Sequence, residues 1–423
     1  MRILLAQNML HLPSHGGANK SNRILMEQLA AAGHLVHVVA PLSGAMRTGP
    51  QEVRVADLVR RGAVPAGDSR PGEVTYTRGG VTVHAVTEPA GLGRRIAEVA
   101  GELEPDWTLV PSDDPGLVVL GAALRATPDR VVYLVHTLQQ LPFGPGAFYP
   151  SAAGVRMVRR AAGTVAVSRA AQDYCRQHGS LPSTLIYPHI YDETPAGPLP
   201  CPRPDTGRVT MINPCGYKGL PIFLGLADAC PDVRFLAVPT WGTTDAERAE
   251  LARRPNIEVV PPADDIEEIF ARTRVLLMPS LWDETFGYAC VEAMLRGVPV
   301  LASDVGGLAE AKLGVPYLLP VRPVREYRTA GHARPVPVLP EQDIEPWLAA
   351  LRRLLADPAH HDDLAERSRL AARRFTGGLA KDALEKYLTG LTPAAPPPAL
   401  SPARRAALAR LAATRLGTKG TRP

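Results

Sequence analysis

The chain has 423 residues, of which 45% are apolar and 21% are charged. This length and composition predict a globular protein of two domains and exclude a disordered or fibrous chain. The formal net charge of +5 is more than accounted for by the arginines and lysines of residues 391–423, which contain no acid. The rest of the chain is close to neutral, which argues against nucleic-acid binding.

Cysteine content and apolar runs bear on the location of the protein. Five scattered cysteines without a CxxC pair argue against a disulfide framework or a zinc site and fit a reducing cytoplasm. The apolar stretch at the N-terminus is too short for a signal peptide and is better interpreted as a first strand. No run approaches the roughly 20 apolar residues of a membrane span. We therefore expect a cytoplasmic protein without stable membrane insertion.

The chain opens in the order strand, loop, helix, strand. An apolar run at 1–6 is followed by a polar loop containing Gly16 and Gly17, and then by apolar residues at helical spacing up to Gly33. A β-branched run at 36–41 completes a βαβ unit, which is typical of a doubly wound sheet. Further strands are expected at 81–86, 107–111, 131–135 and 164–167, and helices at 92–102, 116–125 and 168–177.

Two stretches rich in Gly and Pro interrupt this series. Residues 44–80 are expected to contain a surface insertion with a short helix at 53–61. A solvated insertion is the commoner case for such a loop, and a substrate-binding loop is the alternative. Residues 192–207 are expected to form an interdomain linker, because proline and glycine prevent regular structure there. The first domain would then span residues 1–191.

A second α/β series follows and is expected to form a domain at 208–375. Its strands are expected at 208–213, 233–238, 257–260, 274–278 and 298–303, and its helices at 219–229, 244–252, 264–272, 344–356 and 359–374. A further helix at 378–390, within a segment 376–390, is expected to pack back on the first domain. Residues 391–423 form a basic tail rich in Pro and Ala.

The segment 283–310 carries the strongest functional signal. Two acids, Glu284 and Glu292, stand with seven residues between them, and an apolar run precedes the first. The second lies on an expected helix that follows a turn containing Gly287. Free N–H groups and the helix dipole at such a turn suit an anionic ligand.

This segment resembles the nucleotide-sugar site of the retaining family 4 glycosyltransferases of the GT-B fold. The shared features are the E-x7-E spacing, a Gly-Val-Pro-Val run, and the Gly306-Gly307 pair followed by Glu310. The resemblance extends in outline over residues 1–390. It implies an α/β fold in which two Rossmann-like domains face each other across a cleft. The first domain would bind the acceptor and the second the nucleotide sugar.

The resemblance implies a donor-binding role for the whole turn between the two acids. Glu292 would bind the ribose diol, and Glu284 would contact hydroxyls of the donor sugar. The remaining donor-binding residues implied are Thr285, Phe286, Gly287 and Tyr288, whose backbone N–H groups and helix end would hold the diphosphate. The alternative for Glu292 is a surface acid that pairs with Arg296 one turn further on.

A second signal lies between an expected strand and an expected helix, at residues 212–219. Family 4 members place an arginine at the end of this strand and a lysine a few residues on, and both bind the donor diphosphate. Lys218 matches the lysine, whereas Asn213 occupies the position of the arginine. One cation is therefore missing, and Lys218 alone could also be a surface lysine.

Three residues of the first domain complete the expected site. Gly16 and Gly17 resemble the glycine loop that faces the diphosphate and acceptor across the cleft; the motif is not GxGxxG, which argues against a nicotinamide dehydrogenase. His136 ends an expected buried strand, where sites of α/β folds lie, and the family places a histidine there beside the donor sugar. Ser168 is interpreted as a helix N-cap rather than a ligand.

Two clusters are interpreted as structural. The run His360-His361-Asp362-Asp363 contains metal-ligand residue types, but it stands at a helix start, where acids are common. Arg156, Arg159 and Arg160 lie on one expected helical face and could touch an anionic acceptor, although a solvated face is the simpler interpretation.

The expected reaction is transfer of a sugar from a nucleoside diphosphate sugar to a small-molecule acceptor, with retention at the anomeric carbon. The catalytic residues expected are His136, Glu284 and Lys218. A covalent route would need a carboxylate at the anomeric carbon, and Glu284 is the formal candidate. The resemblance favours front-face attack assisted by the leaving phosphate. We expect no metal and no cofactor beyond the nucleotide sugar as co-substrate.

Two other functions are compatible with the same residues. One is a nucleotide-sugar 2-epimerase of the GT-B fold, which needs no acceptor. The other is a non-catalytic nucleotide-sugar-binding subunit of a larger complex. The absence of the arginine fits such a subunit, and so does a possible docking partner for the tail 391–423. The Pro- and Ala-rich tail hints at a natural-product acceptor, and a frayed basic tail is its simplest interpretation.

Overall fold

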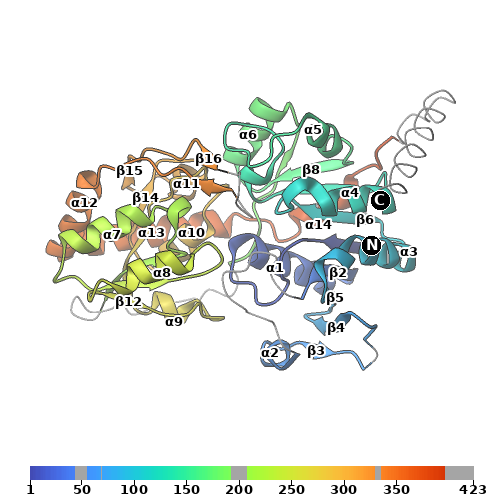
Figure 1. The fold of residues 1–423 in the computed structure, drawn as a ribbon, viewed down its shortest axis with the longest axis horizontal. Coiled ribbons are helices and arrows are strands. Elements are labelled where there is room, and N and C mark those ends of the chain that lie inside the picture. The colour runs from blue at the N-terminus through green and yellow to red at the C-terminus, as the bar shows by residue number, and fades with distance from the viewer. Residues whose placement is uncertain (43–54, 68, 192–206, 329–334, 396–423) are drawn as a thin grey trace, which may run out of the picture.

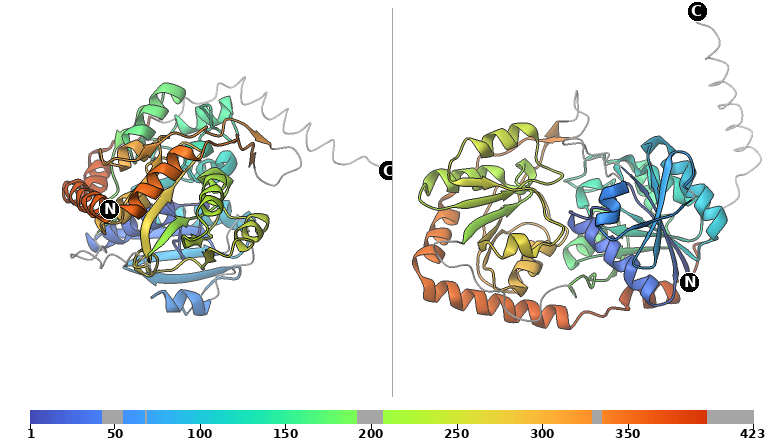
Figure 2. Two further views of the ribbon diagram at one scale, coloured as in Figure 1. Left: turned by 90° about the vertical axis from the view of Figure 1, so that its left-hand side faces the viewer. Right: turned by 90° about the horizontal axis from the view of Figure 1, so that it is seen from below.

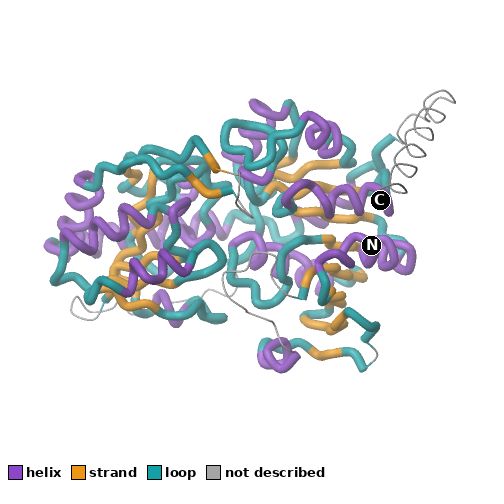
Figure 3. The backbone as a smooth tube through the Cα atoms, in the orientation of Figure 1, coloured by secondary structure: helices purple, strands orange, loops and turns teal. Residues whose placement is uncertain are grey.

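The protein is described from a computed structural model, shown in Figure 1. The described residues are 1–42, 55–67, 69–191, 207–328 and 335–395. The expected linker 192–207 lies outside them except for its last residue, and so does most of the expected tail 391–423. Two sheets, one in each half of the chain, lie side by side with helices around them (Figures 1 and 3).

The first half is built on a nine-stranded sheet of order β3-β4-β5-β2-β1-β6-β7-β8-β9. Its main elements are β1 (Arg2–Ala6), α1 (Gly17–Ala31), β2 (Leu35–Pro41), α2 (Val55–Arg60), β3 (Val64–Pro65), β4 (Glu73–Arg78), β5 (Val81–Val86), α3 (Leu92–Leu103), β6 (Trp107–Pro111), α4 (Val118–Ala126), β7 (Val131–Val135), α5 (Ala152–Val158), β8 (Gly163–Ala166), α6 (Arg169–Gly179) and β9 (Thr184–Leu185). Ile3 and Leu5 belong to one core cluster and Leu4 and Ala6 to another. Because side chains alternate along a strand, this pattern shows that both faces of the sheet are buried.

The second half is built on a six-stranded parallel sheet of order β12-β11-β10-β13-β14-β15. Its elements are β10 (Arg208–Ile212), α7 (Leu220–Ala229), β11 (Phe235–Val238), α8 (Asp245–Ala252), β12 (Ile257–Val259), α9 (Glu267–Phe270), β13 (Thr273–Met278), α10 (Tyr288–Leu295), β14 (Val300–Ser303), α11 (Leu308–Ala311), β15 (Leu318–Leu319), β16 (Tyr327–Arg328), β17 (Val336–Pro337), α12 (Glu345–Ala356), α13 (Pro358–Gly377) and α14 (Ala383–Gly390). The helix expected at 264–272 is only α9, and α11 was not expected.

Both sheets share one strand order. In the first, β5-β2-β1-β6-β7-β8 are mutually parallel, and in the second β12-β11-β10-β13-β14-β15 repeat the same winding. The winding direction reverses between β1 and β6 and again between β10 and β13. Ligands of open α/β sheets bind at the carboxyl ends of strands at such switch points. The expected α/β class with two Rossmann-like halves is confirmed.

The chain returns to the first half at its C-terminal end. The long helix α13 and then α14 run along one side of the molecule toward the N-terminal sheet (Figure 2). Leu384 and Leu388 of α14 are buried in the core cluster that contains Ile3 and Leu5. The apolar positions of α14 therefore fasten the end of the described chain to the first half.

The last part of segment 44–80 is not a surface insertion, contrary to expectation. Strand β4 pairs antiparallel with the whole of β5, and Tyr76 is buried. Gly79 and Gly80, both with positive φ, form the turn between the two strands. The expected short helix is present as α2, while residues 43–54 and 68 lie outside the described part.

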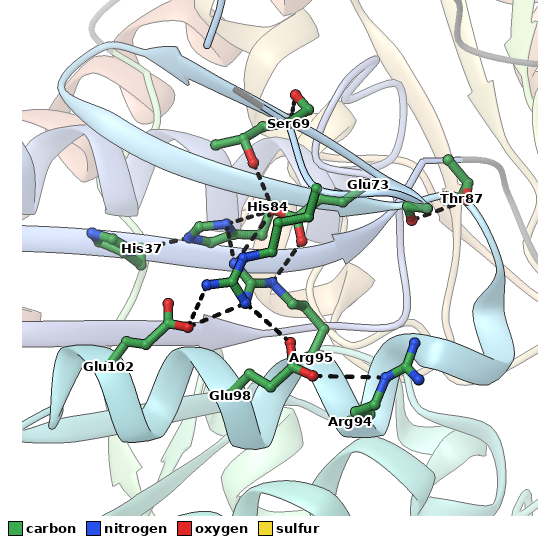
Figure 4. A network of polar contacts seen from close by, with 12 residues as sticks. His37, Ser69, Glu73, His84, Thr87, Arg94, Arg95, Glu98 and Glu102 are labelled. Carbon is green, nitrogen blue, oxygen red and sulfur yellow. Dashed lines mark hydrogen bonds and ion pairs between the residues drawn. The ribbon is translucent and has the colours of Figure 1, made fainter. Parts of the chain in front are cut away.

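A buried charge network joins this hairpin to α3 (Figure 4). The Glu73 carboxylate accepts hydrogen bonds from the His84 ring at 2.8 Å and contacts the Arg95 guanidinium at 2.6 Å. Arg95 also reaches Glu98 and Glu102 of α3, both of which are more exposed. His84 and Arg95 hold the pKa of Glu73 down at about 2, despite its burial, so the carboxylate is charged at neutral pH.

Candidate active site

A cleft of about 460 Å³ contains residues from both halves of the chain. It lies where the carboxyl ends of the strands at the two switch points meet. It brings together all the residues predicted from the sequence to bind the donor or act in catalysis, namely Gly16, Gly17, His136, Asn213, Lys218, Glu284, Thr285, Phe286, Gly287, Tyr288 and Glu292. Their roles stay predictions, while their convergence is a property of the fold.

Two glycines, Gly306 and Gly307, contact the backbone of the loop that carries Glu284. The Gly307 N–H donates to the backbone oxygen of Glu284 at 2.6 Å. A β-carbon on Gly306, where φ is +52°, would come within 2.4 Å of that oxygen. No larger residue fits against this backbone. The Gly-Gly turn therefore fixes the position of the first acid.

Glu284 is paired with a lysine of its own half. The Lys218 Nζ lies 2.5 Å from Glu284 Oε1 and 4.5 Å from the centre of the Trp282 ring, and the Ser280 hydroxyl also donates to Glu284. Lys218 ends a short 3₁₀ turn directly after β10. The lysine is thus a component of the cleft wall and not a free surface side chain.

Glu292 is paired with a lysine of the other half. The Lys20 Nζ lies 2.6 Å from Glu292 Oε1, across 272 residues of sequence. The alternative pairing with Arg296 is wrong, because the Arg296 guanidinium binds Glu267 at 2.7 Å and touches only the backbone oxygen of Glu292. Lys20 was missed from the sequence. Its position in the first turn after the glycine loop is the signal that could have revealed it.

Asn213 lies at the end of β10, as expected for the position of the family arginine. Its backbone is left-handed, with φ of +58°, and its Oδ1 accepts from the Gly242 N–H at 3.0 Å. Its Nδ2 is buried and has no hydrogen-bond partner among the described residues. An amide donor therefore occupies the position where a second cation was expected.

Two helices begin at the same point of the cleft. Helix α1 starts at Gly17 and α10 starts at Tyr288, with Gly16 and Gly287 as their N-cap residues. A β-carbon on Gly17 would lie only 2.8 Å from the Tyr288 ring, so the two starts are in close contact. Unpaired N–H groups and the positive ends of two helix dipoles consequently converge on one anion-binding region.

His136 is buried at the carboxyl end of β7. Burial lowers its pKa to about 4, so the ring is neutral at pH 7. Neither ring nitrogen has a hydrogen-bond partner among the described residues. The backbone around it is well held: its N–H donates to the Ser112 hydroxyl at 3.0 Å, and its oxygen accepts from the Thr285 hydroxyl at 2.8 Å.

Several residues of the 283–310 segment are structural. The Phe286 side chain is buried among Tyr187, Tyr288 and Phe375, so only its backbone can face a ligand. Glu310 accepts from the N–H groups of Arg169 and Ala170 at the start of α6.

The expected N-cap role of Ser168 is confirmed, since its hydroxyl accepts from the Ala171 N–H at 2.9 Å. The same hydroxyl donates to the backbone oxygen of Thr285. The start of α6 and the donor loop are thus tied together across the cleft.

Aromatic side chains of both halves gather at one end of the cleft. Phe148, from the loop after β7, lies 6.4 Å from Tyr217 and 6.5 Å from Trp282, measured between ring centroids. Trp282 also neighbours Trp241 at 5.9 Å. All four rings line the cleft. Although the rings are tilted against one another, they form an apolar wall beside the polar residues.

No metal site is found among the described residues. His360 pairs with the Tyr317 hydroxyl at 2.6 Å, while His361 faces the backbone oxygen of Arg274 at 3.1 Å, so the two histidines serve different contacts. Within the described ranges no helix has the length and apolar character needed to span a bilayer.

Comparison with known families explains this arrangement. Residues 15–193 match the family model described as Glycosyltransferase Family 4. Residues 218–357 match the model described as Glycosyl transferases group 1. The chain belongs to the family 4 glycosyltransferases. The second match begins at Lys218 and contains the whole segment with Glu284 and Glu292.

Curated relatives of this family 4 glycosyltransferase match parts of it. A 2-deoxystreptamine glucosyltransferase of Streptomyces kanamyceticus is 38% identical over 148 residues, 32% of this chain and 36% of the relative. A D-inositol 3-phosphate glycosyltransferase of Kineococcus radiotolerans is 31% identical over 147 residues, 33% of this chain and 31% of the relative. The chain thus spans about a third of the length of these relatives.

Solved structures show the same GT-B architecture over nearly the whole chain. HepE of Anabaena, in complex with UDP and glucose, aligns with a TM-score of 0.63 at 18% identity and covers 92% of this chain and 100% of its own. A sucrose-phosphate synthase of Thermosynechococcus elongatus aligns with a TM-score of 0.61 at 18% identity, covering 92% and 98%. At this identity the likeness concerns the fold of the glycosyltransferase.

Proposed function

We propose that this family 4 glycosyltransferase moves a sugar from a nucleoside diphosphate sugar to a small-molecule acceptor with retention at the anomeric carbon. The observation that carries the proposal is the convergence of two helix N-termini, Lys218 and Lys20 on one region beside two acids. A doubly charged diphosphate matches this region in charge and in hydrogen bonding.

Leaving-group stabilisation is the main catalytic contribution in this proposal. Cleavage of the glycosidic bond builds negative charge on the diphosphate, and fixed donors that face this charge lower the barrier. Lys218 is the cation from the second half. Lys20 supplies from the first half the positive charge that an arginine at position 213 would provide, and the Asn213 amide adds a neutral donor.

The two acids have separate roles in the proposal. Glu292 binds the ribose diol and Glu284 binds hydroxyls of the donor sugar, each exchanging its lysine contact for the ligand. Glu284 is held by Lys218 and Ser280 on the wall of the cleft, which suits a sugar-binding group. The front-face route needs no carboxylate nucleophile, because the leaving phosphate accepts the acceptor's proton. The neutral His136 ring lies where it can donate a hydrogen bond to the sugar.

The acceptor is proposed to be a small natural product. Two relatives from Streptomyces are named for small natural-product acceptors. One is the 2-deoxystreptamine glucosyltransferase, and the other is a UDP-GlcNAc:ribostamycin N-acetylglucosaminyltransferase of Streptomyces fradiae. The second is 36% identical over 76 residues, 16% of this chain and 21% of that relative. The aromatic wall of the cleft provides apolar surface on which the flat face of a ring can pack.

The first test is a thermal-shift screen of the full chain with UDP-, GDP- and dTDP-sugars. A donor is expected to raise Tm, and the same donor should no longer do so in Lys218→Met. The absence of a shift with every donor would refute the proposal. Turnover with an acceptor, followed by NMR of the product, then reports retention. Isomer formation from donor alone would indicate a 2-epimerase, and binding without any turnover would indicate a non-catalytic subunit.

A further inference from the structure

The charges of the cleft are balanced with one exception. Five acids line it. Four of them pair with a cationic side chain: Asp264 with Arg61, Asp283 with Arg325 at 3.5 Å, Glu284 with Lys218 at 2.5 Å, and Glu292 with Lys20 at 2.6 Å. The fifth, Asp113, forms no ion pair with any described residue. Among the described residues, its only side-chain hydrogen-bond partner is the Thr137 hydroxyl, which donates to Oδ1.

Asp113 follows β6 at the switch point of the first sheet. The carboxyl ends of β6 and β1 are neighbours there, because the two strands pair directly. The adjacent Asp114 has a different role: its carboxylate accepts from the N–H groups of Val119 and Leu120 at the start of α4. Of two consecutive acids, one therefore caps a helix and the other faces the cleft from the side opposite the donor loop.

An unpaired carboxylate in this setting is costly. The Oδ2 of Asp113 is buried and accepts no hydrogen bond from the described residues. Burial raises the pKa of Asp113 to about 6, against the opposing effect of the Thr137 hydrogen bond. The group is nevertheless mostly ionised at pH 7. A buried negative charge without a partner is stabilised most by a cation that brings its own hydrogen-bond donors.

The surroundings of Asp113 suit the acceptor and not the nucleotide. Gln140, whose buried Oε1 has no hydrogen-bond partner among the described residues, lines the same cleft. Phe148 and Tyr149 continue it with aromatic surface. The residues expected to hold the diphosphate and ribose lie on the second half and at the start of α1. We therefore expect these residues to make most of the contacts with the acceptor.

We propose that Asp113 binds a protonated amine of the acceptor, so that the acceptor is an amine-bearing ring polyol such as an amino sugar or aminocyclitol. The ammonium group would donate to the Oδ2 of Asp113, and a ring hydroxyl of the acceptor would donate to the Oε1 of Gln140. A phosphorylated acceptor would meet an unpaired negative charge at Asp113. This inference rests on the proposed function, since it assigns the acceptor side of the same cleft.

The test compares free amines with their N-acetyl forms, which lack the positive charge and carry an added acetyl group. The full chain is titrated calorimetrically with 2-deoxystreptamine and its di-N-acetyl form, and with glucosamine and N-acetylglucosamine, both in the presence and absence of UDP. The wild type should bind each free amine about tenfold to a hundredfold more tightly than its amide, as expected for one charge-assisted hydrogen bond. Asp113→Asn should abolish this preference, and Asp113→Glu should retain part of it.

Two controls separate the inference from the proposed function. The UDP affinity of Asp113→Asn should stay within about twofold of the wild type, since the change lies outside the expected diphosphate region. Asp264→Asn removes a paired acid from the same cleft and should leave the ratio of amine to amide affinity unchanged. If the wild type does not bind UDP, that result counts against the proposed function and not against the role of Asp113.

Equal affinity of the wild type for amine and amide would overturn the inference, and so would a preference that survives in Asp113→Asn. No binding of either amine would overturn it as well. If Asp113→Asn does not fold, equal wild-type affinity for amine and amide still overturns the inference, and Asp113→Glu, which should retain only part of the preference, tests the residue.

Discussion

Substitution of Lys20 by Met tests the electrostatic account of the site most directly. The change removes a positive charge that lies 2.6 Å from Glu292 in the cleft and keeps most of the side-chain volume. Removal of one fixed donor from a developing charge costs about 3 kcal/mol in other enzymes, or roughly a hundredfold in kcat. The Lys20 side chain is only 22% exposed, so solvent screens its field weakly. We expect about a hundredfold loss.

The assay separates binding from chemistry. Because charge on the diphosphate grows in the transition state, kcat should fall more than the donor affinity. Lys20→Arg keeps the charge and should retain most of the activity. A Lys20→Met variant with kcat within about threefold of the wild type, and with an unchanged Tm, would refute the role of Lys20.

An arginine at position 213 offers a rescue of Lys20→Met. Asn213→Arg would return a cation to the place where family 4 members carry one. It should cost about 1 kcal/mol of stability, because the backbone there is left-handed with φ of +58°. We expect kcat of the double variant to rise about tenfold above that of Lys20→Met. If the folded double variant gains nothing, the two cations do not substitute for one another.

Three further predictions concern separate features. Glu73→Gln should lower the free energy of unfolding by about 3 kcal/mol in denaturant titrations, because it removes the nearest and most buried carboxylate partner of Arg95. The half-exposed Glu98→Gln should cost less than about 1 kcal/mol. Since the pKa of folded Glu73 is about 2 against an ordinary value of 4.5, wild-type stability should fall as the pH drops from 4.5 to 2, and Glu73→Gln should show a shallower loss. Gly306→Ala should lower both Tm and donor affinity, because its β-carbon would displace the Glu284 loop, and an unchanged Tm would contradict the close contact. Glu284→Gln should keep measurable turnover without a covalent adduct in mass spectra, and an observed adduct in the wild type would contradict front-face attack.

The sequence predicted best what depends on neighbouring residues. The βαβ periodicity of both halves and the acid-containing segment are local patterns, and the confirmed α/β fold and family follow from them. The hairpin of β4 and β5 was missed although it too is local. Residues 73–86 alternate in polarity around the Gly79-Gly80 pair, which is a strong hairpin signal. The Gly and Pro content of the preceding loop obscured it.

Contacts between the halves could not be read from local patterns. Lys20 meets Glu292 across 272 residues, and sequence periodicity predicts only neighbours within one element. Asp113 could have been found by a topological argument: it follows a strand that pairs with β1, so it lies at the switch point. The sequence could not predict that Asp113 has no ion-pair partner among the described residues, because this depends on the positions of all other charges of the cleft.

The two cations of the proposed diphosphate site come from different halves of the chain. Where a family member carries both the arginine and the lysine, both cations come from the nucleotide-sugar domain. In this chain Lys218 comes from the second half and Lys20 from the first, because Asn213 replaces the arginine. Under the proposed function, the diphosphate would therefore be held by cations from both halves. Donor affinity would then depend on how the two halves are placed, and Asn213→Arg should weaken that dependence by restoring both cations to one half.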